Sequence, residues 1–126
     1  MSMTPQQLVA EAKAQIKEID IATAAQHISA GSVVIDVREP AEFEAARLPG
    51  AVSIPRGLLE FKTDHPVLAD KTAEILLYCK SGGRSALAAL NLQRLGYSNV
   101  RSMTGGFDAW TSQGQAVAKD TTQYGG

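Results

Sequence analysis

The chain has 126 residues, of which 44% are hydrophobic and 20% are charged, so we expect one domain with a substantial core. The formal net charge of −1 leaves no basic surface of the kind that binds nucleic acid. The single cysteine excludes an internal disulfide framework and a cysteine-rich zinc site, and it fits a reducing compartment. Residues 1–19 carry several charges and no long apolar run. We therefore expect no signal peptide, no membrane span and a cytoplasmic location.

The N-terminal third predicts a helix, a short strand and a second helix. Thr4 is a good helix cap, Pro5 suits the first turn, and Gln7 follows three residues after the cap. We expect a helix over residues 5–17, a strand over 18–21 and a helix over 22–30 that stops at Gly31. The first helix either packs on the domain or mediates self-association, and the pattern favours neither.

The middle of the chain begins with a β-branched apolar run over residues 32–37, which is typical of a strand buried on both faces. Pro40 predicts the first turn of a short helix. A strand over 51–54, a short helix over 58–62 and a loop around His65-Pro66 are expected next.

The C-terminal half contains an apolar strand over residues 74–78, which delivers Cys79, and then an alanine-rich and leucine-rich helix over 85–95. A last strand over 100–103 precedes a helix that opens at Thr104-Gly105-Gly106 and contains Trp110. From Lys119 onward the chain is polar, and we expect it to be frayed. Strands that alternate with helices predict an α/β fold with a mostly parallel sheet, whose sites lie beyond the carboxyl ends of the strands.

The chemistry is concentrated at Cys79. A short glycine-containing loop and a helix start follow this residue, so backbone N–H groups are expected to converge on its sulfur. Together with the cations Lys80 and Arg84, these amides favour a nucleophilic thiolate. A lone buried cysteine is usually a small hydrophobic residue. Here the glycines, the cations and the helix start favour a functional role.

Four segments in this order resemble a single rhodanese domain, and together they span about residues 19–116. The segments are Val34-Ile35-Asp36-Val37-Arg38-Glu39-Pro40-Ala41-Glu42-Phe43, Leu48-Pro49-Gly50-Ala51-Val52-Ser53-Ile54-Pro55, Tyr78-Cys79-Lys80-Ser81-Gly82-Gly83-Arg84-Ser85 and Gly105-Gly106-Phe107-Asp108-Ala109-Trp110. The resemblance implies a three-layer α/β fold with a mostly parallel sheet of about five strands, flanked by helices and preceded by an extra N-terminal helix. We expect an N-terminal helical extension over 1–18, a rhodanese-like domain over 19–118 and a flexible tail over 119–126.

The resemblance also implies sulfur transfer through a Cys79 persulfide. The donor would be a small sulfur-containing anion such as thiosulfate, and the acceptor would be cyanide, a thiol or a carrier protein, with no cofactor and no metal. The implied active-site loop comprises Lys80, Ser81, Gly82, Gly83, Arg84 and Ser85. The alternative is a non-catalytic module that binds a partner or senses sulfur or redox state. A cysteine phosphatase is ranked lower, because the related phosphatase loops are one residue longer.

Other residues modify this interpretation. Asp36 and Arg38 are expected to support the active loop. Glu42 stands where two-domain thiosulfate sulfurtransferases usually carry an arginine that assists the donor anion, and Arg47 stands where many family members have histidine. Arg56 is a candidate for a compensating charge. These differences make the identity of the donor an open question.

Overall fold

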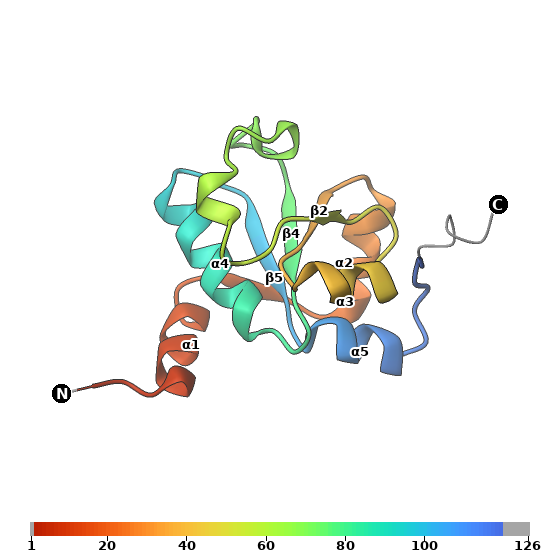
Figure 1. The fold of residues 1–126 in the computed structure, drawn as a ribbon, viewed down its shortest axis with the longest axis horizontal. Coiled ribbons are helices and arrows are strands. Elements are labelled where there is room, and N and C mark those ends of the chain that lie inside the picture. The colour runs from red at the N-terminus through yellow and green to blue at the C-terminus, as the bar shows by residue number, and fades with distance from the viewer. Residues whose placement is uncertain (1, 120–126) are drawn as a thin grey trace.

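The computed structural model describes residues 2–119, which form a five-stranded sheet with helices on both faces (Figure 1). The strands are β1 (Lys17–Ile19), β2 (Val33–Asp36), β3 (Val52–Ser53), β4 (Ile75–Tyr78) and β5 (Val100–Met103). Their order across the sheet is β1-β5-β4-β2-β3, and every pair is parallel. The expected α/β fold with a mostly parallel sheet is confirmed.

Within residues 2–119, five α-helices and two short 3₁₀ helices accompany the strands. The α-helices are α1 (Pro5–Lys13), α2 (Ile21–Ser29), α3 (Pro40–Ala45), α4 (Gly83–Arg94) and α5 (Gly106–Ser112). The 3₁₀ helices η1 (Leu59–Phe61) and η2 (Pro66–Leu68) lie between β3 and β4. No helix within residues 2–119 is long and apolar enough to cross a bilayer.

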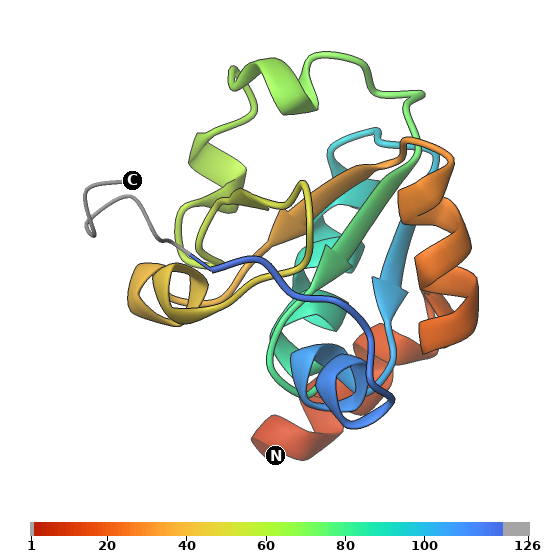
Figure 2. The same cartoon turned by 90° about the vertical axis from the view of Figure 1, so that its right-hand side faces the viewer.

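The two faces of the sheet form two separate cores. Ile35, Leu77 and Cys79 point toward α4, where they pack with Leu92 and the 3₁₀ segments. The alternate residues of the same strands point to the other face and pack with α2 and α5, including Trp110. Figure 2 shows the strands side by side between these helices. Because side chains alternate along a strand, this arrangement places Cys79 on the α4 face.

The N-terminal elements differ from the prediction in their boundaries. Helix α1 ends at Lys13 instead of residue 17, and β1 begins at Lys17 instead of residue 18. Lys17 pairs with Arg101 of β5, so pairing with the sheet replaces the last helical turn that the local sequence favours. Residues 17 and 18 of the expected extension therefore belong to the sheet.

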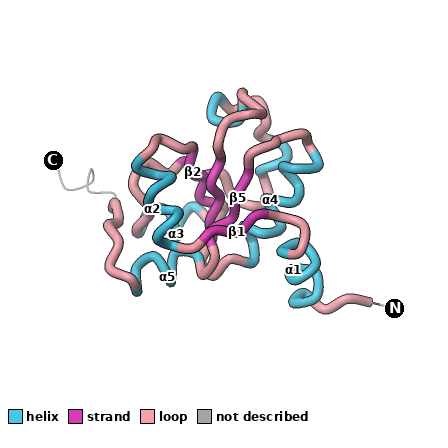
Figure 3. The backbone as a smooth tube through the Cα atoms, turned by 180° about the vertical axis from the view of Figure 1, so that it is seen from behind, coloured by secondary structure: helices cyan, strands magenta, loops and turns pink. Residues whose placement is uncertain are grey.

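Helix α1 packs on the domain. Ala12 is 1% exposed and lies in a small core with Ala86 and Leu90 of α4. Figure 3 shows α1 beside α4, at the side of the molecule where β1 and β5 pair. The expected frayed tail, apart from Lys119, lies outside the described residues.

Other boundaries also shift. The strand expected over 51–54 is limited to Val52–Ser53, and the helix expected over 58–62 is the single 3₁₀ turn η1. The loop expected around His65-Pro66 contains η2, which the His65 ring caps by accepting the N–H of Val67. Helix α4 starts at Gly83, two residues before the expected start.

The start of α5 lies directly against the segment after β4. The N–H of Phe107 donates to the carbonyl of Cys79 at 2.8 Å, and the N–H of Asp108 donates to that of Lys80 at 3.0 Å. A Cβ on Gly106 would lie 2.5 Å from the Cys79 carbonyl oxygen. Gly106 thus permits the contact between α5 and the cysteine loop.

We expect Gly106→Ala to destabilise the protein more than Gly114→Ala. Both glycines have positive φ angles, +58° and +74°, but a Cβ on Gly114 would meet nothing within 4 Å. Left-handed backbone costs a non-glycine residue about 1–2 kcal/mol, and the clash at Gly106 adds about 1–3 kcal/mol. Urea unfolding of both variants measures the difference. Equal losses would contradict the close approach.

Candidate active site

Cys79 follows β4, at the edge of the sheet where the carboxyl ends of the strands meet. Its side chain is 1% exposed. The sulfur accepts the N–H of Gly82 at 3.1 Å and the N–H of Ser85 at 3.3 Å. Two amides therefore point at Sγ, an arrangement that stabilises negative charge on sulfur.

The loop conformation depends on Gly82. This residue caps α4 with a φ of +108°, in the left-handed region that favours glycine. Gly83 and Arg84 form the first turn of the helix, and Ser81 is exposed. The loop brings two backbone donors to the sulfur because the chain reverses at Gly82 and immediately enters α4.

The two cations of the loop both form ion pairs. The Arg84 guanidinium contacts the Glu42 carboxylate through two N–O pairs, at 3.0 and 3.4 Å. Lys80 Nζ contacts the Asp108 carboxylate at 3.1 and 3.2 Å, and both side chains are exposed. Glu42 thus interacts with Arg84 across 42 residues of sequence, and Asp108 is a site residue that the sequence pattern did not identify.

The Glu42–Arg84 pair shifts the pKa of both side chains. The Arg84 hydrogen bonds hold the pKa of Glu42 below its ordinary value, and Glu42 raises the pKa of Arg84. The lowered Glu42 value means that the pair stabilises the fold above the ordinary glutamate pKa. This contribution is lost as the pH falls through the lowered value. Both side chains are about one-third exposed, so the contribution is about 0.2–1 kcal/mol.

Asp36 and Arg38 lie beside the loop in a buried network. The Asp36 carboxylate accepts the Arg38 backbone N–H at 2.8 Å and the Arg38 guanidinium at 2.7–3.1 Å. The Tyr78 hydroxyl donates to Asp36 at 2.6 Å and accepts the N–H of Leu48 at 3.1 Å. Tyr78 immediately precedes Cys79, so the network fixes the strand that carries the nucleophile.

The network also shifts the pKa values of Arg38 and Tyr78. Burial lowers the pKa of Arg38, but the hydrogen bonds and charge of Asp36 outweigh this effect and the net direction is upward. Burial, together with the Asp36 charge, raises the pKa of Tyr78. The phenol therefore keeps its proton and remains a donor to Asp36.

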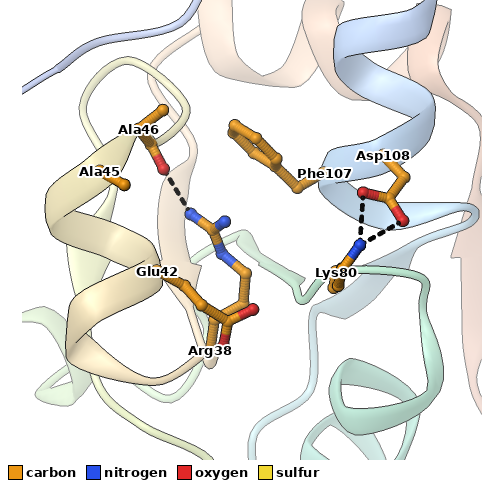
Figure 4. Close-up of a pocket in the computed structure, with 7 residues that line it drawn as sticks. All are labelled: Arg38, Glu42, Ala45, Ala46, Lys80, Phe107 and Asp108. Atoms are coloured by element: carbon orange, nitrogen blue, oxygen red, sulfur yellow. Dashed lines mark hydrogen bonds and ion pairs between the residues drawn. The ribbon is translucent and has the colours of Figure 1, made fainter.

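A pocket of about 280 Å³ opens beside the loop (Figure 4). The Arg38 guanidinium forms part of one wall, where it donates to the Ala46 carbonyl at 2.6 Å and lies 4.2 Å from the centre of the Phe107 ring. Ala45 and Phe107 make the pocket partly apolar, while Glu42 and the Lys80–Asp108 pair add charge. Cys79 is not among the lining residues, although it immediately precedes the lining residue Lys80 in the sequence.

The other cations considered from the sequence do not line this pocket. Arg47 donates to the Phe43 carbonyl at 3.2 Å and lies over the Phe43 ring. Arg56 forms an ion pair with Glu60 at 3.3 Å. Arg56 lines a different pocket, together with residues of α1 and α4, so it does not supply a compensating charge in the pocket beside the loop. Within residues 2–119, no group of three metal-ligating side chains is found.

Helix α1 reaches the loop from the side. The Val9 side chain lies 3.7 Å from where a Cβ on Gly83 would be, and Lys13 Nζ lies 3.9 Å from the same position on Gly82. These distances are ordinary contacts, so α1 supports the loop without crowding it. The sequence left the packing of α1 open, and no local signal could have indicated this contact.

We expect Gly82→Ala to slow the reaction of Cys79 far more than Gly83→Ala, because only Gly82 has a left-handed backbone. Alanine at position 82 is strained and displaces the N–H that contacts Sγ, so alkylation of Cys79 at neutral pH should slow about tenfold. Gly83 has an ordinary helical backbone, and its alanine variant should stay within about twofold of wild type. Iodoacetamide kinetics with mass detection measures both rates. Equal slowing would show that the left-handed turn is not the cause.

Comparisons with known proteins agree on one family. Residues 20–113 match the model of the rhodanese-like domain. A sulfurtransferase from Allochromatium vinosum is 30% identical over 104 residues, which cover 81% of this chain and 94% of that protein. Thiosulfate sulfurtransferase 16, chloroplastic, from Arabidopsis thaliana is 32% identical over 108 residues, which cover 76% of this chain and 88% of that protein.

A solved structure gives the same fold. A Rhodopseudomonas palustris protein of unknown function, described as a possible tyrosine phosphatase, is 31% identical with a TM-score of 0.86. The superposition covers 94% of this chain and 96% of that chain. From the family match and the two sulfurtransferase relatives, we conclude that this chain belongs to the rhodanese-like domain family.

Proposed function

We propose that the protein is a sulfurtransferase that carries a sulfane sulfur on Cys79 as a persulfide. The main support is the position of Sγ, which accepts backbone N–H groups from Gly82 and Ser85. Fixed amide donors stabilise a charged sulfur without reorganising during the reaction. The sulfurtransferase relatives support the same class of reaction.

The proposed cycle has two nucleophilic steps. The Cys79 thiolate attacks the outer sulfur of a donor such as thiosulfate, the new S–S bond forms, and sulfite leaves with the electron pair of the broken bond. An acceptor then attacks the outer sulfur of the persulfide. The bond to Sγ breaks and returns its electron pair to the Cys79 thiolate, so electrons balance without a redox partner.

Burial of the nucleophile restricts the donor. Sγ belongs to a side chain that is 1% exposed, so a donor must present a protruding terminal sulfur. The pocket beside the loop has room for the rest of a small donor or for a short segment that carries a thiol. We propose a small sulfur-containing anion as donor and a thiol or a protein as acceptor, in the reducing environment of the cytoplasm.

Charge pairing around the site weighs against efficient use of dianions. Arg38, Lys80 and Arg84 each contact a carboxylate, namely Asp36, Asp108 and Glu42. An anionic donor that uses Arg84 must compete with Glu42. We therefore propose that Glu42 limits the rate with thiosulfate.

Two other functions compete with this proposal. A non-catalytic binding module would retain the fold without turnover. A phosphatase is favoured by the description of the Rhodopseudomonas palustris protein. The loop of this chain places only four residues between Cys79 and Arg84, and Glu42 engages the Arg84 guanidinium that would bind phosphate. Sulfur transfer therefore remains the leading proposal.

We expect wild-type protein to gain the mass of one sulfur atom after incubation with thiosulfate or inorganic polysulfide, and to lose it on addition of cyanide. Cys79→Ser removes the only thiol, so it should gain no sulfur and lose turnover by about 1,000-fold or more. Intact mass and thiocyanate formation measure both effects. No gain with either donor, together with hydrolysis of an aryl phosphate, would replace the proposal with a phosphatase.

We expect Glu42→Gln to raise kcat/KM for thiosulfate about threefold to tenfold, mainly through a lower KM, because Arg84 loses its charged partner. The matched control is Glu44→Gln, which removes the same charge from an exposed position on α3. Steady-state kinetics at low and high salt measures the effect, which should shrink with salt. If both variants gained equally in kcat/KM, the cause would be the change in net charge and not the release of Arg84 from Glu42.

A further inference from the structure

The buried hydroxyl groups of Ser85 and Ser102 form a chain that leads away from the Cys79 sulfur. Ser85 Oγ is 3.6 Å from Sγ and 2.8 Å from the Oγ of Ser102. Both serines are fully buried. Ser102 lies on β5 and pairs in register with Leu77 of β4, so it shares the α4 face with Cys79.

The hydroxyl of Ser102 has one partner. Among the hydrogen bonds of residues 2–119, Ser102 Oγ takes part only in the contact with Ser85. A buried hydroxyl that donates nowhere is costly, so Ser102 directs its proton to Ser85 Oγ. Ser85 must then donate its own proton elsewhere, because each hydroxyl has only one.

Two acceptors remain for the Ser85 proton. One is the carbonyl of Gly82 at 3.4 Å. The other is Sγ, 3.6 Å away, which can accept from Ser85 once Cys79 has lost its own proton. When Cys79 is a thiol, its S–H donates to Ser85 Oγ, and Ser85 donates to Gly82. When Cys79 is a thiolate, it can only accept, and the Ser85 hydroxyl rotates toward the negative charge. Each serine hydroxyl therefore has an acceptor whether Cys79 is a thiol or a thiolate, and the S–H of the thiol has one as well.

We propose that Ser102 is a positioning residue that acts through Ser85 to stabilise the Cys79 thiolate. This inference rests on the proposed function in that the thiolate is both the attacking group and the leaving group of sulfur transfer. In the second step the acceptor forms its bond to the outer sulfur, the bond to Sγ breaks with its electron pair on Sγ, and the Ser85 O–H turns toward that charge. Ser85 keeps its proton throughout, so no co-reactant is needed.

The first test measures the thiolate independently of sulfur transfer. The rate of Cys79 alkylation by iodoacetamide is recorded against pH for wild type, Ser85→Ala, Ser102→Ala and Thr104→Val. Thr104 follows β5, and its hydroxyl donates to the Ile19 carbonyl at 3.0 Å. Thr104→Val therefore removes a hydroxyl near the end of the same strand and serves as the matched control.

We expect Ser102→Ala to move the pH midpoint of alkylation upward by about half a unit, as expected for weakening one hydrogen bond to a charged group. Ser85→Ala should move it further, and Thr104→Val should leave it unchanged. The turnover of Ser102→Ala should fall severalfold below the midpoint and approach wild type above it. Ser102→Thr restores a hydroxyl and should restore the midpoint.

An unchanged midpoint in folded Ser102→Ala would overturn the role of Ser102, since a purely structural serine would alter stability without altering titration. Circular dichroism melting identifies variants that fail to fold, and Ser102→Val, which also lacks the hydroxyl at a strand position that favours β-branched residues, then replaces Ser102→Ala in the comparison with Thr104→Val. If wild type transfers no sulfur but the midpoint shifts as expected, the proposed function fails and the positioning role stands.

Discussion

The buried carboxylate of Asp36 organises the side of the molecule on which the candidate site lies. An ion pair removed from water is stable only when its hydrogen bonds are satisfied, and Asp36 receives bonds from Arg38 and Tyr78. Through Tyr78 it ties β2 to the strand that carries Cys79. Through Arg38 it fixes the pocket wall against Phe107 and the Ala46 carbonyl. The position of the nucleophile and the shape of the pocket therefore depend on the same charge.

Two kinds of interaction surround the Cys79 sulfur: backbone N–H groups that donate to it, and side-chain ion pairs beside it. The sulfur is held by backbone N–H groups of Gly82 and Ser85, whose positions follow from the turn into α4. The positive charges of Arg84 and Lys80 are neutralised by ion pairs with Glu42 and Asp108, respectively. Stabilisation of a charged sulfur thus comes from the backbone, while the ion pairs influence which donor can approach.

The sequence predicted the order and type of the strands and α-helices because buried strands and capped helices leave clear patterns. It failed at boundaries where a tertiary contact competes with local preference. Residues 14–17 favour a longer α1, yet Lys17 pairs with Arg101 in the sheet. At position 83 a glycine is a poor helix former, yet α4 begins there because Gly82 provides the left-handed cap. Whether a residue at the end of a helix or strand belongs to that element depends on its contacts with other parts of the fold.

By itself the sequence determined the family, the parallel α/β architecture and the loop that follows Cys79, because each of these is encoded in local segments and in their order along the chain. Only the tertiary structure decided that Glu42 neutralises Arg84, that Asp108 pairs with Lys80 and that Ser102 contacts Ser85. These partners come from different elements, and their contacts depend on how α3, α5 and β5 pack around β4. Local patterns fix the backbone of a segment, whereas the charge and proton partners of its side chains are set by packing between segments.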